Sequence, residues 1–330
     1  MRYRIWQSVA VAATTGALGP LRYVRAMARE IATYSTKKFP MQVNGPAIAV
    51  TFLCGYGLYG RAAGTVTLPS GFALALLTFF ILFIQLRLVD DLADKDLQHN
   101  GGAQVATGDG VEKPRALWTA LGVTICAVVA VNQDWAALAV AFLALGATLV
   151  ADLGLKRTIR MHQGSSIMLR AAHWAALLIL YEGAAFLIFL YLYYSWLAIT
   201  HIRLPTFLVL AVTAAFWSQY EFWKYSRHFS RPDWQTYDAS IEHTRLALIG
   251  IVTVSLFAQI ALYWLVSLPA LYLIYSVTLC GVFILWVFLC SASEGLRRAQ
   301  RWWRDNMGLL FVAGVILGLA FALISTSETP

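Results

Sequence analysis

The sequence predicts an all-α, polytopic membrane protein, and its composition and the length of its apolar runs carry that prediction. Of its 330 residues, 59% are hydrophobic and 13% are charged, whereas soluble domains are about 45–50% apolar and about 25% charged. The apolar runs are continuous, unlike the roughly ten-residue alternating strands of a membrane β-barrel. These observations exclude an ordinary water-soluble enzyme, and no polar stretch is long enough to form a separate soluble domain.

Nine segments have the length of about 18 to 25 residues that a membrane-spanning helix needs. The fifth is long enough for one tilted helix or for two short helices hinged near Glu182 and Gly183, which would give ten spans. The nine predicted spans are residues 44–62, 70–89, 115–133, 135–153, 165–199, 205–225, 245–267, 269–291 and 307–325.

The distribution of basic residues decides between nine and ten spans, because cytoplasmic loops carry an excess of Lys and Arg. With nine spans, all 25 Lys and Arg residues except Arg61 and Arg203 fall on the side that holds the N-terminus. One extra span at the fifth segment would move every later loop to the opposite side. We therefore predict nine spans in a bacterial cytoplasmic membrane, with the N-terminus cytoplasmic and the C-terminus outside. We therefore expect the net charge of +8 to favour contact with anionic membrane lipid and not with nucleic acid.

Residues 1–43 form a predicted cytoplasmic segment ahead of a membrane domain of residues 44–325, and residues 326–330 form a short tail. Apolar residues recur at helical spacing over residues 20–40, which favours an amphipathic interfacial helix on the anionic leaflet. A solvated basic leader fits the same periodicity equally well.

Four aspartates occur within seven residues where the second predicted span ends, in the stretch R-L-V-D-D-L-A-D-K-D. If the helix continues through this point, Asp90 and Asp94 are i, i+4 neighbours and Asp91 and Asp94 are i, i+3 neighbours, so three carboxylates share nearly one face. Such carboxylates repel unless a cation joins them, and Mg²⁺ accepts one or two carboxylates while taking other ligands from substrate phosphates. We predict Asp90, Asp91 and Asp94 as catalytic Mg²⁺ ligands. A solvated acidic helix end is the alternative.

A second polar cluster ends the sixth predicted span. Glu221 lies at membrane depth there, where an ionisable side chain indicates a functional site and needs a partner, and Lys224 at i+3 is a candidate partner. We predict Glu221 and the later Asp233 as additional metal ligands. A Glu–Lys pair that only fixes helix packing explains Glu221 equally well.

Basic residues follow the second, fourth and sixth spans on the same predicted side of the membrane. Together with the acidic clusters they suit a diphosphate, because the metal neutralises part of its charge and the cations neutralise the rest. Ordinary flanking by positive charge explains each basic residue separately, but it does not explain the acids. The predicted diphosphate-binding residues are Arg87, Lys156, Arg157, Lys224 and Arg227.

This order of spans and motifs resembles the UbiA superfamily of intramembrane prenyltransferases, with this chain as a divergent member. The first motif of that family reads N-D-x-x-D-x-x-x-D. Here Asp90 stands at the Asn position, Asp91 and Asp94 at the next two, and Gln98 at the last. The second motif, D-x-x-x-D, is half present, because its positions fall on Phe229 and Asp233.

The resemblance implies a helical bundle around a central cavity, in which Mg²⁺ assists the ionisation of an isoprenyl diphosphate. Lys156 and Arg157 match a basic pair that contacts the diphosphate in the family. The implied activity belongs to terpenoid biosynthesis and transfers the prenyl chain to an aromatic or other lipophilic acceptor. The incomplete second motif leaves the second metal site and the acceptor open.

Three alternatives stay open beside prenyl transfer to a lipophilic acceptor. A terpene cyclase of the same superfamily would ionise the same diphosphate but let the substrate's own double bond attack. A polar acceptor, such as a phosphosugar or glycerol phosphate, would require further cations beside the cavity. A transporter or lipid-binding membrane protein is the alternative from another class; against it, the charged residues gather at one membrane face and the sequence shows no related halves.

Overall fold

The structure of the chain is a computed structural model that describes residues 41–65, 68–100, 114–132, 134–155, 167–230, 241–290 and 301–325. These residues form nine α-helices and one short π-helix, without a strand, so the all-α prediction is confirmed for this part of the chain. The helices are α3 (Met41–Ala62), α4 (Phe72–Asn100), α5 (Pro114–Val131), α6 (Trp135–Leu149) with its π-helical continuation η1 (Val150–Leu155), α8 (Ile167–Thr200), α9 (Thr206–Ser230), α10 (Ile241–Val266), α11 (Ala270–Cys290) and α12 (Arg301–Ser325).

Six of the described helices are long and apolar enough to cross a membrane, which supports the prediction of a helical membrane protein. They are α4, α6 with η1, α8, α10, α11 and α12, over the parts of each that are most apolar. Since α3, α5 and α9 are not among them, the count of nine membrane spans stays a prediction.

The fifth predicted segment is one continuous helix. Helix α8 has 34 residues and runs through Glu182 and Gly183 without interruption. At 1.5 Å per residue its length is about 50 Å, more than the roughly 30 Å of the hydrocarbon core. The single-helix prediction is therefore confirmed, and the helix extends beyond its most apolar stretch, Ile179–Thr200.

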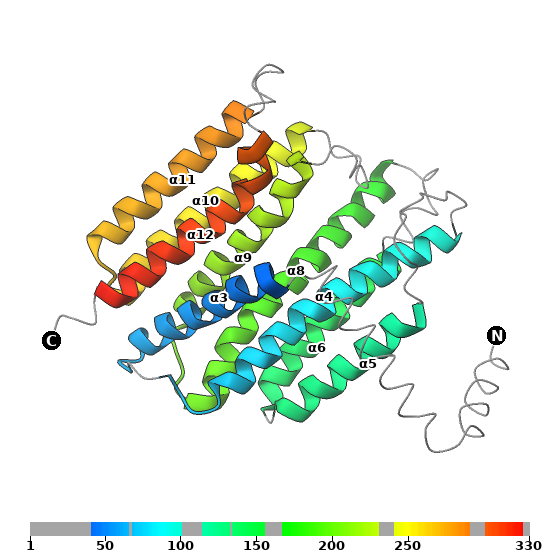
Figure 1. Cartoon of the computed structure of the whole chain (residues 1–330), viewed down its shortest axis with the longest axis horizontal. Helices are drawn as coiled ribbons and strands as arrows, with labels where there is room; N and C mark the ends of the chain where they lie inside the picture. Colours follow the sequence, from blue (N-terminus) through cyan, green and yellow to red (C-terminus); the bar gives the residue numbers. More distant parts are fainter. Residues whose placement is uncertain are drawn as a thin grey trace.

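The helices form two groups that meet along α8, α9 and α3 (Figure 1). The first helix group consists of α4, α5, α6 and α8, and the second consists of α9, α10, α11 and α12. Helix α3 lies between them and contacts members of both groups, while α8 packs directly against α9. Any side chain at the α8–α9 contact therefore affects how the two groups fit together.

The two ends of the bundle differ in the length of their connections. At one end, named here the turn end, 3 to 9 residues connect α3 to α4, α5 to α6, α8 to α9 and α10 to α11. At the opposite end, named the motif end, lie the last turns of α4, η1 and α9 and the first turn of α8, because successive helices run in opposite directions (Figure 1). Arg61 and Arg203, the two exceptions to the predicted charge partition, both lie at the turn end.

Buried and half-buried hydrogen bonds between side chains join the helices of the core. The Tyr56 hydroxyl of α3 donates to Ser195 Oγ of α8 at 2.9 Å. The Tyr191 hydroxyl of α8 donates to Asn132 Oδ1 at 2.6 Å, and Asn132 Nδ2 donates to Thr78 Oγ1 of α4 at 2.9 Å. Buried polar groups are costly unless they are paired in this way, so these bonds specify which helix faces meet.

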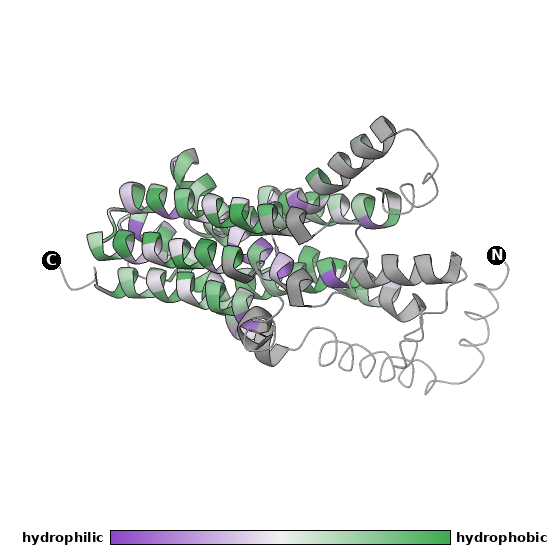
Figure 2. Ribbon diagram, turned by 90° about the horizontal axis from the view of Figure 1, so that it is seen from above, coloured by the Kyte–Doolittle hydropathy of each residue, from purple (hydrophilic) through white to green (hydrophobic). Residues whose placement is uncertain are grey.

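The outer surface is apolar as well. Phe207, Trp264 and Leu317 are all more than 60% exposed, and Figure 2 shows hydrophobic residues along the coloured parts of most helices. A helix that is apolar on every side belongs in a large core or in a membrane. In a chain of this size the exposed apolar faces fit lipid.

Helix α12 approaches its neighbours closely through glycine. A Cβ atom at Gly308 would collide with Ser226 Oγ and would lie 2.8 Å from the Cα of Trp223 on α9. At Gly318 it would lie 2.6 Å from Cε1 of Tyr275 on α11. Small residues allow this kind of close backbone contact between membrane helices, so the α9–α12 packing depends on Gly308.

Gly308→Ala should lower the free energy of unfolding by about 1–3 kcal/mol, because the added methyl group overpacks the contact with α9. Thermal unfolding of the detergent-solubilised protein measures this. Gly281→Ala is the matched control, since Gly281 is exposed on α11 and its Cβ would meet nothing within 4 Å. Equal melting temperatures for the two variants would contradict the packing argument.

Candidate functional site

A buried ionic cluster joins α8 to α9 toward the motif end. The Lys224 ammonium lies 2.9 Å from Glu182 Oε1 and 2.5 Å from Glu221 Oε2. The Tyr225 hydroxyl also donates to Glu182 Oε1, at 3.0 Å. These four residues, Glu182, Glu221, Lys224 and Tyr225, are called the ionic cluster below.

The ionic cluster holds two carboxylates and one ammonium group in an apolar part of the molecule. The Glu221 side chain is fully buried, and those of Glu182 and Lys224 are 20% and 19% exposed. From the part of the chain that the structure describes, no donor bonds to Glu221 Oε1 or to Glu182 Oε2. The ammonium also lies 4.5 Å from the centre of the Tyr181 ring, a favourable cation–π distance. Removing two charges from water is costly, so each carboxylate depends strongly on Lys224.

The sequence predicted one half of this arrangement. The pairing of Glu221 with Lys224, expected from their i, i+3 spacing, is confirmed. Glu182 was considered only as a hinge, and its pairing with Lys224 from another helix was missed. The available signal was that Glu182 is the one acidic residue between positions 167 and 200, and an acid inside an apolar helix needs a partner.

Glu221 was predicted both as a metal ligand and as a partner of Lys224, and the structure shows the second of these contacts. Lys224 already supplies a cation directly beside it. Among the residues that the structure describes, no group of three or more His, Cys, Asp or Glu side chains is arranged to hold a metal ion. Asp233, the other predicted ligand of a second metal, lies outside the described residues.

The first aspartate motif lies on a helix, as the predicted i, i+3 and i, i+4 relations between its aspartates require. Helix α4 extends through Asp90, Asp91 and Asp94 to Asn100, so the i, i+4 and i, i+3 relations apply. The side chains of these three aspartates lie outside the described part of the structure. Just before them, Leu88 and Val89 are buried, so the packed core extends at least to the residue before the motif.

The predicted diphosphate-binding residues are only partly described. Arg87 is half-buried on α4, one turn before Asp91, and Lys224 belongs to the ionic cluster. Arg227 lies on α9, but its side chain is not described. Lys156 and Arg157 lie outside the described residues and follow directly after η1.

Asp152 is an acidic residue that the sequence analysis did not select. It lies on η1, is 2% exposed, and η1 packs against both α4 and α8. A π-helix is rare and often marks a functional site. Its signal in the sequence was an acid at the end of an apolar span, four residues before Lys156.

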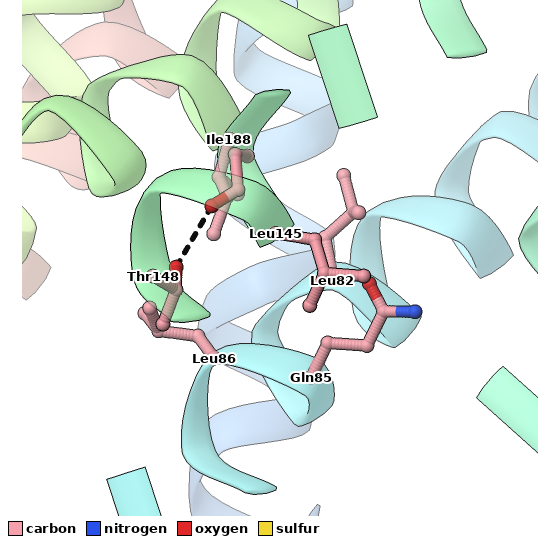
Figure 3. A pocket seen from close by; sticks show the side chains of 7 residues that line it. Leu82, Gln85, Leu86, Leu145, Thr148 and Ile188 are labelled. Carbon is pink, nitrogen blue, oxygen red and sulfur yellow. Dashed lines mark hydrogen bonds between the residues drawn. The ribbon is translucent and has the colours of Figure 1, made fainter. Parts of the chain in front are cut away.

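A small cavity lies between α4, α6 and α8, inward from these acidic positions (Figure 3). Its two polar side chains have hydrogen-bond partners: Gln85 Nε2 donates to Thr124 Oγ1 at 3.2 Å, and Thr148 Oγ1 donates to the Ala144 carbonyl at 2.8 Å. The walls are otherwise apolar. The lining residues are Leu82, Gln85 and Leu86 of α4, Ala144, Leu145 and Thr148 of α6, and Ile188 of α8.

Comparisons of the chain with protein-family models, with curated proteins and with solved structures found no match.

Lys224→Met should lower the free energy of unfolding by about 3 kcal/mol or more, because two carboxylates lose the cation that lies beside both of them. Adding Glu182→Gln and Glu221→Gln to that variant should recover most of the loss, since no charge then stays buried. Thermal unfolding in detergent compares the two, with Arg203→Met at the turn end as the control for loss of a basic residue. A triple variant no more stable than Lys224→Met would contradict the electrostatic explanation.

Proposed function

We propose that the protein is a Mg²⁺-dependent intramembrane prenyltransferase, which ionises an isoprenyl diphosphate and transfers its prenyl chain to an aromatic or other lipophilic acceptor. One observation supports this most directly. Helix α4 stays helical through the aspartate motif and ends at the same end of the bundle as η1 and α9. The three charged motifs are therefore carried by, or directly follow, helix ends that lie at the same end of the bundle.

The residues divide the chemistry between them in this proposal. Asp90, Asp91 and Asp94 hold Mg²⁺, which when bound draws negative charge from the diphosphate as it leaves. Arg87, Lys156, Arg157 and Arg227 bind the diphosphate oxygens. The allylic C–O bond breaks and its electron pair leaves with the diphosphate. A pair of π electrons of the acceptor then forms the new C–C bond, and the acceptor loses a proton.

The proposal changes the role of Lys224. Its ammonium is already within ion-pair distance of two carboxylates, so we assign it to the α8–α9 contact and not to the diphosphate. Glu221 is removed from the metal site for the same reason. Arg87, Lys156, Arg157 and Arg227 remain for the diphosphate. These four basic residues outnumber the negative charges that stay on a diphosphate once Mg²⁺ is bound.

The proposed setting is a cytoplasmic membrane, with nine spans, a UbiA-like bundle, the motif end facing the cytoplasm and the C-terminus outside. The turn end holds few basic residues, Arg61 and Arg203, and this supports the orientation. A cyclase that uses the same donor is distinguished from a transferase by its products.

A cation-coupled transporter is the second candidate, supported by the position of the ionic cluster between the two helix groups. Buried ionisable residues inside a membrane often mark an ion path. This candidate predicts cation flux into proteoliposomes that is lost in Glu182→Gln. The prenyltransferase proposal predicts no such flux.

Purified protein with Mg²⁺ and geranyl, farnesyl or geranylgeranyl diphosphate should release diphosphate, measured together with mass analysis of the organic extract. Asp91→Asn and Asp94→Asn should each lower turnover by about a hundredfold or more, because a charge that stabilises the leaving group is lost. A cyclic hydrocarbon or alcohol formed without acceptor would identify a cyclase, and diphosphate release without one would favour a transferase.

Asp134→Asn is the matched control for these variants. It removes the same charge at the turn end but keeps an oxygen that can accept the N-cap hydrogen bond from Ala137 N, now 2.9 Å long. We expect wild-type turnover for it. Absence of turnover with every donor, while cation flux is observed, would replace the enzyme proposal by transport.

A further inference from the structure

We propose that a lipid bilayer surrounds the bundle on every side. One boundary of its hydrocarbon core lies at exposed tryptophans of the turn end, and the other lies at the level of the first acidic residues of four helices. The bilayer is thus the partner of the apolar outer surface of both helix groups. This inference does not depend on the proposed enzyme activity, and it places those acidic residues at the level of the lipid headgroups.

Exposed apolar side chains occur at middle depth on both helix groups. They lie 8 to 12 residues, about 12–18 Å, from the turn end of their helices. A protein partner would cover one face of the bundle, whereas acyl chains cover every face at once. The residues are Val123 of α5 and Leu143 of α6 in the first helix group, and Phe257 of α10, Val282 of α11 and Leu317 of α12 in the second.

Exposed aromatic side chains mark the boundary at the turn end. Trp135 is the first residue of α6, and Trp264 lies two residues before the end of α10. Both are more than 70% exposed, and Trp is enriched where hydrocarbon meets the headgroups. Before α9, the exposed residues change from Arg203 to Phe207 within four positions. Such a change is expected where water gives way to lipid.

The length of the apolar helices sets the distance to the other boundary. In the described part of the chain, the six candidate spans have 18 to 22 residues, which is about 27–33 Å at 1.5 Å per residue. The hydrocarbon core of a bilayer is about 30 Å thick. A bilayer whose boundary lies at the turn-end tryptophans therefore reaches its second boundary at the motif end.

The first acidic residues of four helices lie near this second boundary. Counted from the turn end of each helix, they come after 15 to 18 residues, about 22–27 Å along the axis. A charge is most costly at the bilayer centre, and transport sites usually lie near that midplane. The level found here suits contact with headgroups and water instead. The residues are Asp90 of α4, Asp152 of η1, Glu182 of α8 and Glu221 of α9.

The test places single nitroxide spin labels on the full chain, reconstituted in phosphatidylcholine bilayers. Collision rates are measured with oxygen, which concentrates in hydrocarbon, and with a nickel chelate, which stays in water. Cys126 and Cys290 are first replaced by Ser, while Cys54 and Cys280 are buried and stay. Lipid exposes a label to oxygen alone, water exposes it to the nickel chelate, and a protein partner shields it from both.

The labels are attached at four positions that are exposed in the structure. These are Leu143→Cys and Leu317→Cys at middle depth, Arg203→Cys as the water reference, and Ile179→Cys, three residues from Glu182 toward the motif end. We expect nickel contact to be lost at the two middle positions while oxygen contact stays high. At Ile179 nickel contact should return toward its level at Arg203. Val123→Cys and Phe257→Cys replace a middle variant that does not fold.

Three results would overturn the inference. Nickel contact at a middle position as strong as at Arg203 would show water where lipid is proposed. Loss of contact with both reagents at either middle position would show a protein partner on that helix group. Loss of nickel contact at Ile179 equal to that at Leu143 would place the level of Glu182 inside the hydrocarbon core and not at the headgroups.

Discussion

The pairing of Lys224 with two carboxylates is the interaction on which the arrangement of the helices depends. Apolar side chains can pack against one another in several ways, and inside a membrane lipid tails compete for the same contacts. A buried carboxylate has no such freedom, because it must stay beside its cation. Glu182 on α8 and Lys224 on α9 therefore fix one relation between the first and second helix groups, and Tyr225 adds a hydrogen bond to the same carboxylate.

The remaining contacts are consistent with that fixed relation. Phe189 of α8 contacts Tyr220 of α9, with ring centres 6.0 Å apart, and Tyr220 in turn contacts Phe83 of α4. On the other side of α9, Gly308 lets α12 approach the backbone of Trp223. A shift of α9 by one turn would separate Lys224 from Glu182 and would also move Trp223 away from that glycine. The ionic contact and the close packing thus select the same register.

Hydropathy predicted well where the helices lie, because lipid requires apolar side chains along the whole length of a span. It predicts spans and not helix ends: the candidate span on α4 ends at Val89 as expected, while α4 and α9 continue to Asn100 and Ser230, since a helix does not stop where its residues become polar. The i, i+3 pair of Glu221 and Lys224 was predictable because both belong to one helix. The Glu182 partner, 42 positions from Lys224, depends on which helices become neighbours, and no local pattern of the sequence contains that information.

The cavity and the ionic cluster bear differently on the two proposed functions. A transport site must bind its cargo and release it to both sides, which requires groups that bind the cargo directly and a path through the bundle. In the described residues the cluster is satisfied in part by its own lysine, and the nearby cavity has apolar walls whose polar groups are already bonded. Apolar walls of this kind do not supply the groups that would bind a transported cation. The described contacts therefore fit a structural role for the ionic cluster better than a role in cation transport.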